Sequence, residues 1–345
     1  MDSLPTLTQR HLNRALLARQ LLLKRARTTL PNALESVAGL QAQYAPSMYI
    51  GLWSRLEGFT REDLNHALES LSVVQGTLMR VTIHLVSARD YWLFAAGVRR
   101  GRREWWLRVH SGGTSSRDLA TAASRLRRQL AAGPMHWTEI DKLLGKPLSS
   151  GVGLWIDLVR VPPSGTWERR RADLYAAAEE WLRPADVTAE EGLERLVRAY
   201  LRGFGPATPR EIANWAGVPV RDIALGIKRL RLRRFRSESG EELLDLSRAP
   251  LPDPETPAPV RFLPTWDATL LAHARRTGVL PEKYRPLVFT TKTPHSVATF
   301  LVDGKVAGIW RYERGEVQLE PFERLDRSTL RALREESARL AAFHA

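Results

Sequence analysis

A thirteen-residue pattern occurs twice in this chain and constrains its fold more than any other feature. Residues 133–145 and 205–217 share Gly-Pro, four residues, Glu-Ile, four more residues and a final Gly. In the second copy, Thr208 is typical of a helix N-cap, Glu211 occupies the capping-box position and Gly217 is typical of a helix end. A repeat of this kind predicts two copies of one supersecondary unit.

The first copy carries the same helix signals, at Thr138 and Gly145. The alignment continues past the helix without a gap, because Leu158–Val161 matches Leu230–Arg233 as a strand-like segment. A helix, a turn, a second helix and a two-stranded hairpin make a winged helix. The repeat therefore predicts two winged helices in tandem.

A proline-rich segment, 249–259, divides the chain, with five prolines in eleven residues. This density excludes a helix or an inner strand, so we predict a stiff, extended linker. Before the repeats, helical periodicity at 8–24, 31–44 and 60–70 precedes a β-rich segment with a predicted turn near Gln75-Gly76. Helices followed by a hairpin indicate a third, divergent winged helix at the N-terminus.

The C-terminal part has a different character. Three apolar runs predict a β-meander: 297–302, 305–312 and 316–322. Asp303-Gly304 lies between the first two runs, which is a strong hairpin signal. A closing helix is predicted over Ser328–Phe343, with Ser328 as its N-cap.

The predicted fold is mainly α with β-hairpins, of the α+β class. It combines tandem winged-helix units with a C-terminal α+β domain. The predicted parts are an N-terminal winged-helix-like domain with the Gln-Ala-Gln motif, a second and a third winged helix, the Pro-rich linker and a β-meander/α domain: 1–110, 117–185, 190–248, 249–259 and 260–345.

The chain is strongly basic. It has 52 Lys and Arg residues, of which only seven are Lys, against 38 Asp and Glu, for a formal net charge of +14. Arg suits phosphate because its planar guanidinium bonds two oxygens at once. A GC-rich genome also raises the Arg content, but clustering of the Arg residues favours a polyanionic partner. The clusters are Arg99, Arg100, Arg102 and Arg103; Arg125, Arg127 and Arg128; Arg169, Arg170 and Arg171; and Arg231, Arg233, Arg234 and Arg236.

Composition also excludes several classes of protein. The chain has no Cys, which rules out disulfides, thiolate nucleophiles and Cys-ligated zinc. Its eight His residues are scattered, so we expect neither a metal site nor a cofactor. No apolar run approaches the roughly 20 residues of a membrane helix, and no signal-peptide segment is visible. We therefore expect a cytoplasmic, nucleoid-associated monomer that binds no membrane.

The segment Leu34–Pro46 carries two glutamines, Gln41 and Gln43. On a helix, Gln41 falls on the stripe that should be apolar, where an unpaired amide costs about 1–3 kcal/mol. Gln43 would lie about 200° away, so both side chains reach one cavity only if the helix ends here. Pro46 favours such an end. Taken alone, these residues favour a structural role, with one Gln bonded to a neighbouring loop and the other exposed.

Five segments along nearly the whole chain carry a family resemblance: GLQAQYAPSMYIGLWSRL, LMRVTIHLVSARDYW, VPPSGTWERRRADLY, FLPTWDATLL and LVDGKVAGIWR. They resemble the AlkZ/YcaQ-type alkylpurine DNA glycosylases, bacterial proteins with tandem winged helices. A Gln-Φ-Gln or Gln-Φ-Asp motif marks the catalytic site in that family, and Gln41, Ala42 and Gln43 match the first form. The resemblance implies a monofunctional glycosylase that releases cationic N7-alkylated purines from double-stranded DNA, with unhooking of interstrand crosslinks as an associated activity.

Other residues are candidates for DNA contact. Thr82 and His84 share one face of a predicted strand by alternation, with Arg80 just before them. A structural role is the alternative for His84. In the loop of the second unit, rigid prolines precede an aromatic tip that suits entry into a DNA groove, unless Trp167 packs on its own domain. The candidates in this loop are Pro163, Ser164, Trp167, Arg169 and Arg170.

Three classes of function compete. Winged helices alone favour a transcription regulator, which usually adds a dimerisation or effector domain and reads a palindrome. An architectural DNA-binding protein without chemistry is the second class. The Gln-Φ-Gln motif within matching flanking sequence favours the third, a DNA glycosylase.

Overall fold

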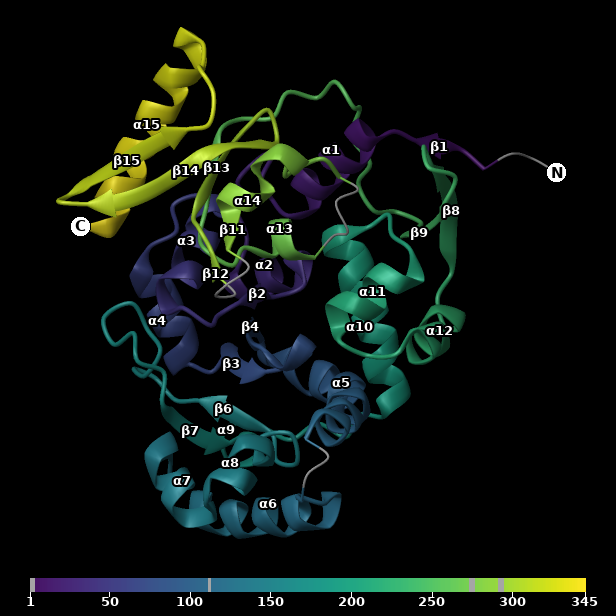
Figure 1. Ribbon diagram of the computed structural model, residues 1–345, viewed down its shortest axis with the longest axis vertical. Helices are drawn as coiled ribbons and strands as arrows, with labels where there is room; N and C mark the ends of the chain where they lie inside the picture. Colours follow the sequence, from purple (N-terminus) through teal and green to yellow (C-terminus); the bar gives the residue numbers. More distant parts are fainter. Residues whose placement is uncertain (1–3, 111–112, 273–276, 291–294) are drawn as a thin grey trace.

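The computed structural model describes residues 4–110, 113–272, 277–290 and 295–345. In Figure 1 the second winged-helix unit lies at the bottom, the third on the right and the C-terminal hairpin and helix at the upper left, around the N-terminal unit. Helices and mostly antiparallel strands build every part, so the predicted α+β class is confirmed. None of the helices in these four ranges combines the length and the hydropathy that a bilayer span requires.

In the N-terminal unit, helices pack around three neighbouring strands in the order β2-β4-β3. Its elements are β1 (Thr6–Leu7), α1 (Gln9–Arg19), α2 (Leu30–Val37), β2 (Leu40–Gln41), α3 (Ala45–Arg55), α4 (Arg61–Glu69), β3 (Val73–Thr77), the 3-10 turn η1 (Met79–Val81), β4 (Ile83–Ser87) and α5 (Ala88–Val109). The Thr60 hydroxyl caps α4 in a capping box with Asp63, since each side chain bonds to the other's backbone N–H.

The predicted helix over 31–44 is wrong in its second half. Ala38 and Gly39 have positive φ angles of 65° and 76°, which end α2 after Val37. The chain then runs on as β2, which pairs with β4 more than forty residues later in the sequence. This long-range pairing overrides the local helical pattern.

The predicted turn at Gln75-Gly76 is also wrong, because both residues lie inside β3 and the turn falls at 78–82. Gly76 pairs with His84 of β4 and with Val159 of β6, which joins the first two units in one six-stranded sheet. A Cβ at Gly76 would lie 2.6 Å from the Tyr91 ring of α5. A glycine here therefore lets α5 pack against this sheet.

The second and third units each consist of helices followed by a two-stranded hairpin. The second contains α6 (Ser116–Leu130), β5 (Met135–His136), α7 (Trp137–Leu144), α8 (Lys146–Val152), β6 (Leu158–Arg160), β7 (Leu174–Ala177) and α9 (Ala178–Trp181). The third contains α10 (Ala189–Phe204), α11 (Pro209–Ala216), α12 (Val220–Lys228), β8 (Leu232–Ser237) and β9 (Glu242–Leu246).

Helix signals in the two repeat copies differ in outcome. Thr208 caps α11 as predicted, and Gly217 ends it with a φ of 72°. In the first copy the N-cap is His136, whose N–H donates to the Glu139 carboxylate at 2.7 Å. The predicted cap at Thr138 is wrong because that residue already lies inside α7.

The C-terminal domain contains a four-stranded antiparallel sheet, ordered β10-β13-β14-β15. Its elements are β10 (Arg261–Leu263), α13 (Ala268–Leu271), η2 (Glu282–Tyr284), α14 (Arg285–Val288), β11 (Phe289–Thr290), β12 (His295–Ser296), β13 (Thr299–Val302), β14 (Lys305–Glu313), β15 (Glu316–Pro321) and α15 (Arg327–His344). The predicted meander is present as β13 to β15. The predicted Ser328 cap is wrong, because α15 starts earlier and Asp326 accepts the Thr329 N–H at 2.9 Å.

The units share their hydrophobic cores. One core joins Tyr91 of α5 to Tyr200 of α10 and Trp215 of α11. The linker 249–259 contains neither helix nor strand, as predicted, yet it is bound to α1, since Arg14 Nε donates to the Thr256 carbonyl at 2.6 Å. The tandem units therefore form one packed body in which residues far apart in sequence can meet at a site.

Candidate active site

Gln41 and Gln43 lie on one extended segment between α2 and α3. Alternate residues of an extended chain point to the same side, so the two glutamines share a face and Ala42 faces away. Gln41 Nε2 donates to Gln43 Oε1 at 2.6 Å. Gln41 is 7% exposed, whereas Gln43 is exposed. The segment therefore presents a buried amide and an exposed amide in direct contact.

Arg80 holds the buried amide. Its guanidinium donates to Gln41 Oε1 at 3.3 Å and to the Trp215 carbonyl at 2.7 Å. Trp215 lies in the last turn of α11, where the carbonyl groups attract a cation. A Cβ at Gly217 would lie 2.8 Å from the backbone nitrogen of Arg80, so this glycine lets the end of α11 approach the turn that contains Arg80. Both of these hydrogen bonds are made within the protein, and the DNA contact expected for Arg80 stays a prediction.

This hydrogen-bond chain determines how each amide points. Arginine is only a donor, so the Gln41 atom facing Arg80 is the oxygen. The Gln41 nitrogen then faces Gln43, where it meets the Gln43 oxygen. Gln43 is consequently the solvent-facing end of a chain that starts in the third unit.

His84 lies beside Gln41, because β2 and β4 pair these two residues. The imidazole is 3% exposed, and its Nδ1 donates to the Thr82 carbonyl at 3.0 Å. Burial, together with the charge of Arg80, lowers the pKa of His84 to about 3. The DNA contact predicted for His84 is wrong in this structure because the ring is buried. Thr82 is half-buried and its hydroxyl donates to the Met79 carbonyl at 3.0 Å.

Acid should destabilise the folded protein through His84. The unfolded chain takes up a proton below a pKa of about 6.5, whereas the folded imidazole stays neutral down to about 3. Stability contributed by the neutral ring is therefore complete above about pH 6.5 and falls by about 1.4 kcal/mol per pH unit below it. Urea unfolding at pH 6.5 and 5 should show a fall about 2 kcal/mol larger in the wild type than in His84→Asn. The same fall in unfolding free energy in the wild type and in His84→Asn would contradict a buried, neutral His84.

A second arginine, which the sequence did not reveal, contacts the same segment. Arg160 of β6 donates to the Ala42 carbonyl at 3.2 Å, between the two glutamines. Its Nε is buried and has no hydrogen-bond partner among the described residues. The sequence shows Arg160 as a charged residue within the apolar run Leu158–Val161. Its position next to the glutamine segment follows only from the pairing of β6 with β3.

The loop between β6 and β7 does not project as the predicted wing. Trp167 is 7% exposed, and its ring packs edge-on against Tyr49 and Phe343, with both centroid distances at 5.7 Å. Ser164 is 8% exposed and its oxygen accepts the Asp173 N–H at 3.0 Å. Both side chains hold the loop against the protein, which favours the packing alternative for Trp167, although its partners Tyr49 and Phe343 belong to other units. The DNA contacts expected for Trp167 and Ser164 stay predictions. Figure 1 shows the loop on the left of the molecule, beside α4.

Three other residues of this loop remain candidates for DNA contact. Pro163, Arg169 and Arg170 are exposed. Arg170 donates to the Tyr44 hydroxyl at 3.3 Å, and Tyr44 follows Gln43 directly in the chain. The loop therefore places the Arg170 guanidinium next to Tyr44, at the end of the glutamine segment.

Many of the clustered arginines bind carboxylates of the same chain. Arg99 and Arg102 each donate to Asp157 at 2.7 Å, and Arg233 donates to Asp245 at 2.7 Å. Further pairs are Arg100–Asp222, Arg127–Glu179, Arg171–Asp173 and Arg234–Glu242. The clusters thus connect elements of the fold, and only part of their charge is left for phosphate.

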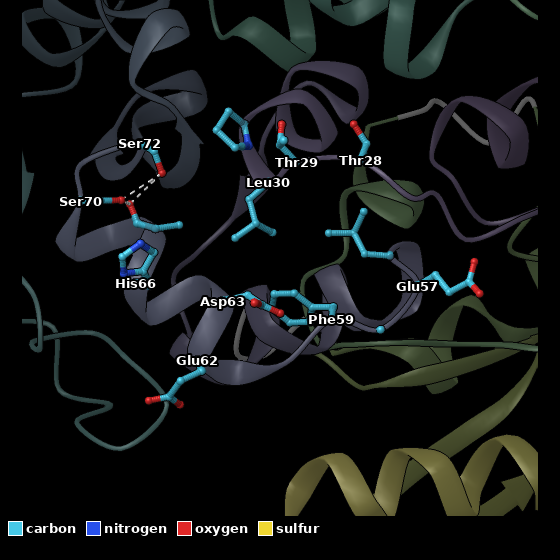
Figure 2. Close-up of a pocket in the computed structure, with 14 residues that line it drawn as sticks. Thr28, Thr29, Leu30, Glu57, Phe59, Glu62, Asp63, His66, Ser70 and Ser72 are labelled. Atoms are coloured by element: carbon cyan, nitrogen blue, oxygen red, sulfur yellow. Dashed lines mark hydrogen bonds between the residues drawn. The ribbon is translucent and has the colours of Figure 1, made fainter.

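A cavity of about 720 Å³ lies apart from the glutamine pair, between the start of α2 and α4. Figure 2 shows the carboxylates of Glu57, Glu62 and Asp63 around it, which disfavour a phosphate. Across the described ranges, no group of three or more His, Asp or Glu side chains is placed to hold a metal ion. The groups that the glutamine segment itself presents are the amides of Gln41 and Gln43 and the guanidinium groups of Arg80 and Arg160.

Comparisons with known proteins agree with this architecture. The family model described as "DNA glycosylase AlkZ-like" matches residues 34–343. The chain is 22% identical over 356 residues to an interstrand DNA cross-link repair glycosylase from Streptomyces sahachiroi, covering 94% of this chain and 93% of that protein. The solved structure of Streptomyces sahachiroi DNA glycosylase AlkZ matches with a TM-score of 0.81 at 18% identity, covering 98% of this chain and 97% of that one. Because the family model spans most of its length, the chain belongs to the AlkZ-like DNA glycosylase family.

Proposed function

We propose that this DNA glycosylase is monofunctional and hydrolyses the N-glycosidic bond of cationic N7-alkylated purines in double-stranded DNA, acting as a monomer. Family membership supports the reaction class, and the name of the Streptomyces relative supports damaged DNA as the substrate. The observation that carries the proposal is the hydrogen-bonded pair of Gln41 and Gln43, one buried and one exposed.

The pair has no acid or base of useful strength. A glutamine amide neither protonates a leaving base nor deprotonates water, and a neighbouring imidazole with a pKa of about 3, that of His84, is too weak a base. An N7-alkylated guanine is already cationic and leaves as a neutral base. The electron pair of the C1′–N9 bond moves onto the base, water adds to C1′, and the water proton passes to solvent.

The remaining tasks are orientation and charge stabilisation. An amide oxygen can position the water and lower the energy of an oxocarbenium-like sugar through its dipole. Gln43 is exposed whereas Gln41 is buried and held by Arg80, so we assign the contact with water and sugar to Gln43 and its positioning to Gln41. A site of this kind should fail on neutral, stable bases, which need protonation to leave.

Crosslinked purines fit the same site. A base that remains tethered to the opposite strand is hard to flip into a closed pocket. Gln43 is exposed, so the sugar can be approached while the base stays outside an enclosed cavity. We therefore extend the proposal to the unhooking of interstrand crosslinks.

Incubation with a duplex carrying one N7-methylguanine tests the proposal. We expect free N7-methylguanine and an intact abasic strand that breaks only after alkali, while the matched undamaged duplex is unchanged. Strand breaks without alkali would show that the enzyme is not monofunctional. Binding of both duplexes without base release would instead favour a regulatory or architectural role.

A further inference from the structure

A cleft of aromatic and basic side chains adjoins the end of the glutamine segment. It consists of two cavities of about 250 and 500 Å³ that have several lining residues in common. We term this cleft the aromatic cleft and define it by six of the residues that line it: Tyr44, Arg170, Thr265, Trp310, Arg311 and Tyr312. Each cavity is close to or within the size range of small-molecule sites, about 300–1,000 Å³.

Flat rings line this cleft. Tyr44 is 43% exposed, so part of this residue is open to solvent. Tyr312 stacks on His344, with ring centroids 4.0 Å apart and planes at 21°. Trp310 is buried beneath, and its Nε1 donates to the Leu263 carbonyl at 3.0 Å, which fixes the floor. The walls therefore suit a planar, aromatic ligand.

Two arginines give the cleft a positive charge. Arg170 touches the Tyr44 hydroxyl. The Arg311 side chain is 62% exposed and pairs at 3.2 Å with Glu320, itself 64% exposed. Such exposed pairs are weak, so a phosphate can take the place of Glu320. Rings beside arginines are the combination that binds single-stranded nucleic acid, through base stacking and phosphate contacts.

We propose that the aromatic cleft binds one unpaired nucleotide of the DNA strand that carries the lesion. The proposal rests on the proposed function, since Tyr44 directly follows Gln43, consecutive Cα atoms lie about 3.8 Å apart, and the two exposed side chains leave the extended backbone on opposite sides. A strand that places its sugar at Gln43 therefore passes the cleft with the adjoining nucleotide. That base stacks on Tyr44, and Arg170 and Arg311 bind its phosphate.

The test uses the full chain and a fluorescein-labelled hexathymidine strand, followed by anisotropy. Tyr44→Ala and Arg311→Gln should each weaken binding about tenfold or more, because stacking and the phosphate contact are lost. Tyr44→Phe should retain the affinity, since the ring is kept. Arg202→Gln, an exposed arginine on α10, serves as the matched control and should stay within about twofold.

Two results would overturn the cleft proposal. One is unchanged hexathymidine binding in the Tyr44→Ala and Arg311→Gln variants. The other is displacement of the strand by thymidine monophosphate at an equal molar concentration, which would identify a free-nucleotide site. Neither result involves base release, so excision by the wild type separately decides the glycosylase proposal.

Discussion

Replacing Gln43 by Ala should lower the single-turnover release of N7-methylguanine about tenfold or more, equivalent to about 1.4 kcal/mol or more in the barrier. The loss follows because Gln43 is the exposed amide at the end of the chain from Trp215 through Arg80 and Gln41. Gln41→Ala should have an effect of similar size, since without it the Gln43 amide is no longer oriented. The double variant should be little slower than either single variant, because the two side chains act as a unit.

DNA affinity separates this chemical effect from a loss of binding. Both glutamines are uncharged, so the affinity for undamaged duplex should stay within about twofold in all three variants. Gln129→Ala removes an exposed glutamine from α6 and should leave base release unchanged. A double variant that releases the base at the wild-type rate would end the catalytic assignment of the pair.

Local signals in the sequence predicted the helices better than their first residues, since the N-caps expected at Thr138 and Ser328 are His136 and Asp326. The cap at Thr208 and the stop at Gly217 are present, because a cap depends only on residues within three positions. The helix predicted across Gln41 failed for the converse reason. Its strand state comes from pairing with β4, and no helical pattern in a single segment reports a partner so far along the chain.

The candidate site was predictable only in part, for a similar reason. The sequence identified Gln41 and Gln43 through a motif, and placed them on one face only on the condition that the helix ends early. Their neighbours Arg80 and Arg160 come from a turn in the first unit and a strand in the second. The arginine clusters overstated the charge that is free to bind phosphate for the same reason. A charge count does not show that Asp157 lies next to Arg99 and Arg102.

The carboxylate of Asp245 should be among the most sensitive positions for stability. It accepts from Arg19 at 2.7 Å and from Arg233 at 2.7 Å, and both Arg19 and Asp245 are fully buried. Arg19 also donates to carbonyl groups of α10 and of the linker, at Leu201 and Pro250. Asp245→Ala leaves a buried guanidinium without its counter-ion, which should cost about 3–5 kcal/mol of unfolding free energy.

An exposed ion pair on the same hairpin provides the matched control for Asp245. Arg234 and Glu242 connect β8 and β9 just as Arg233 and Asp245 do, but their side chains are 60% and 50% exposed. Arg234→Ala should therefore cost less than about 1 kcal/mol, because water screens the pair and solvates the carboxylate that remains. Urea unfolding of both variants measures the difference. Equal losses of unfolding free energy in the two variants would mean that burial does not determine the strength of these ion pairs. They would also mean that the hydrogen bonds at Asp245 do not hold α1, the third unit and the linker together.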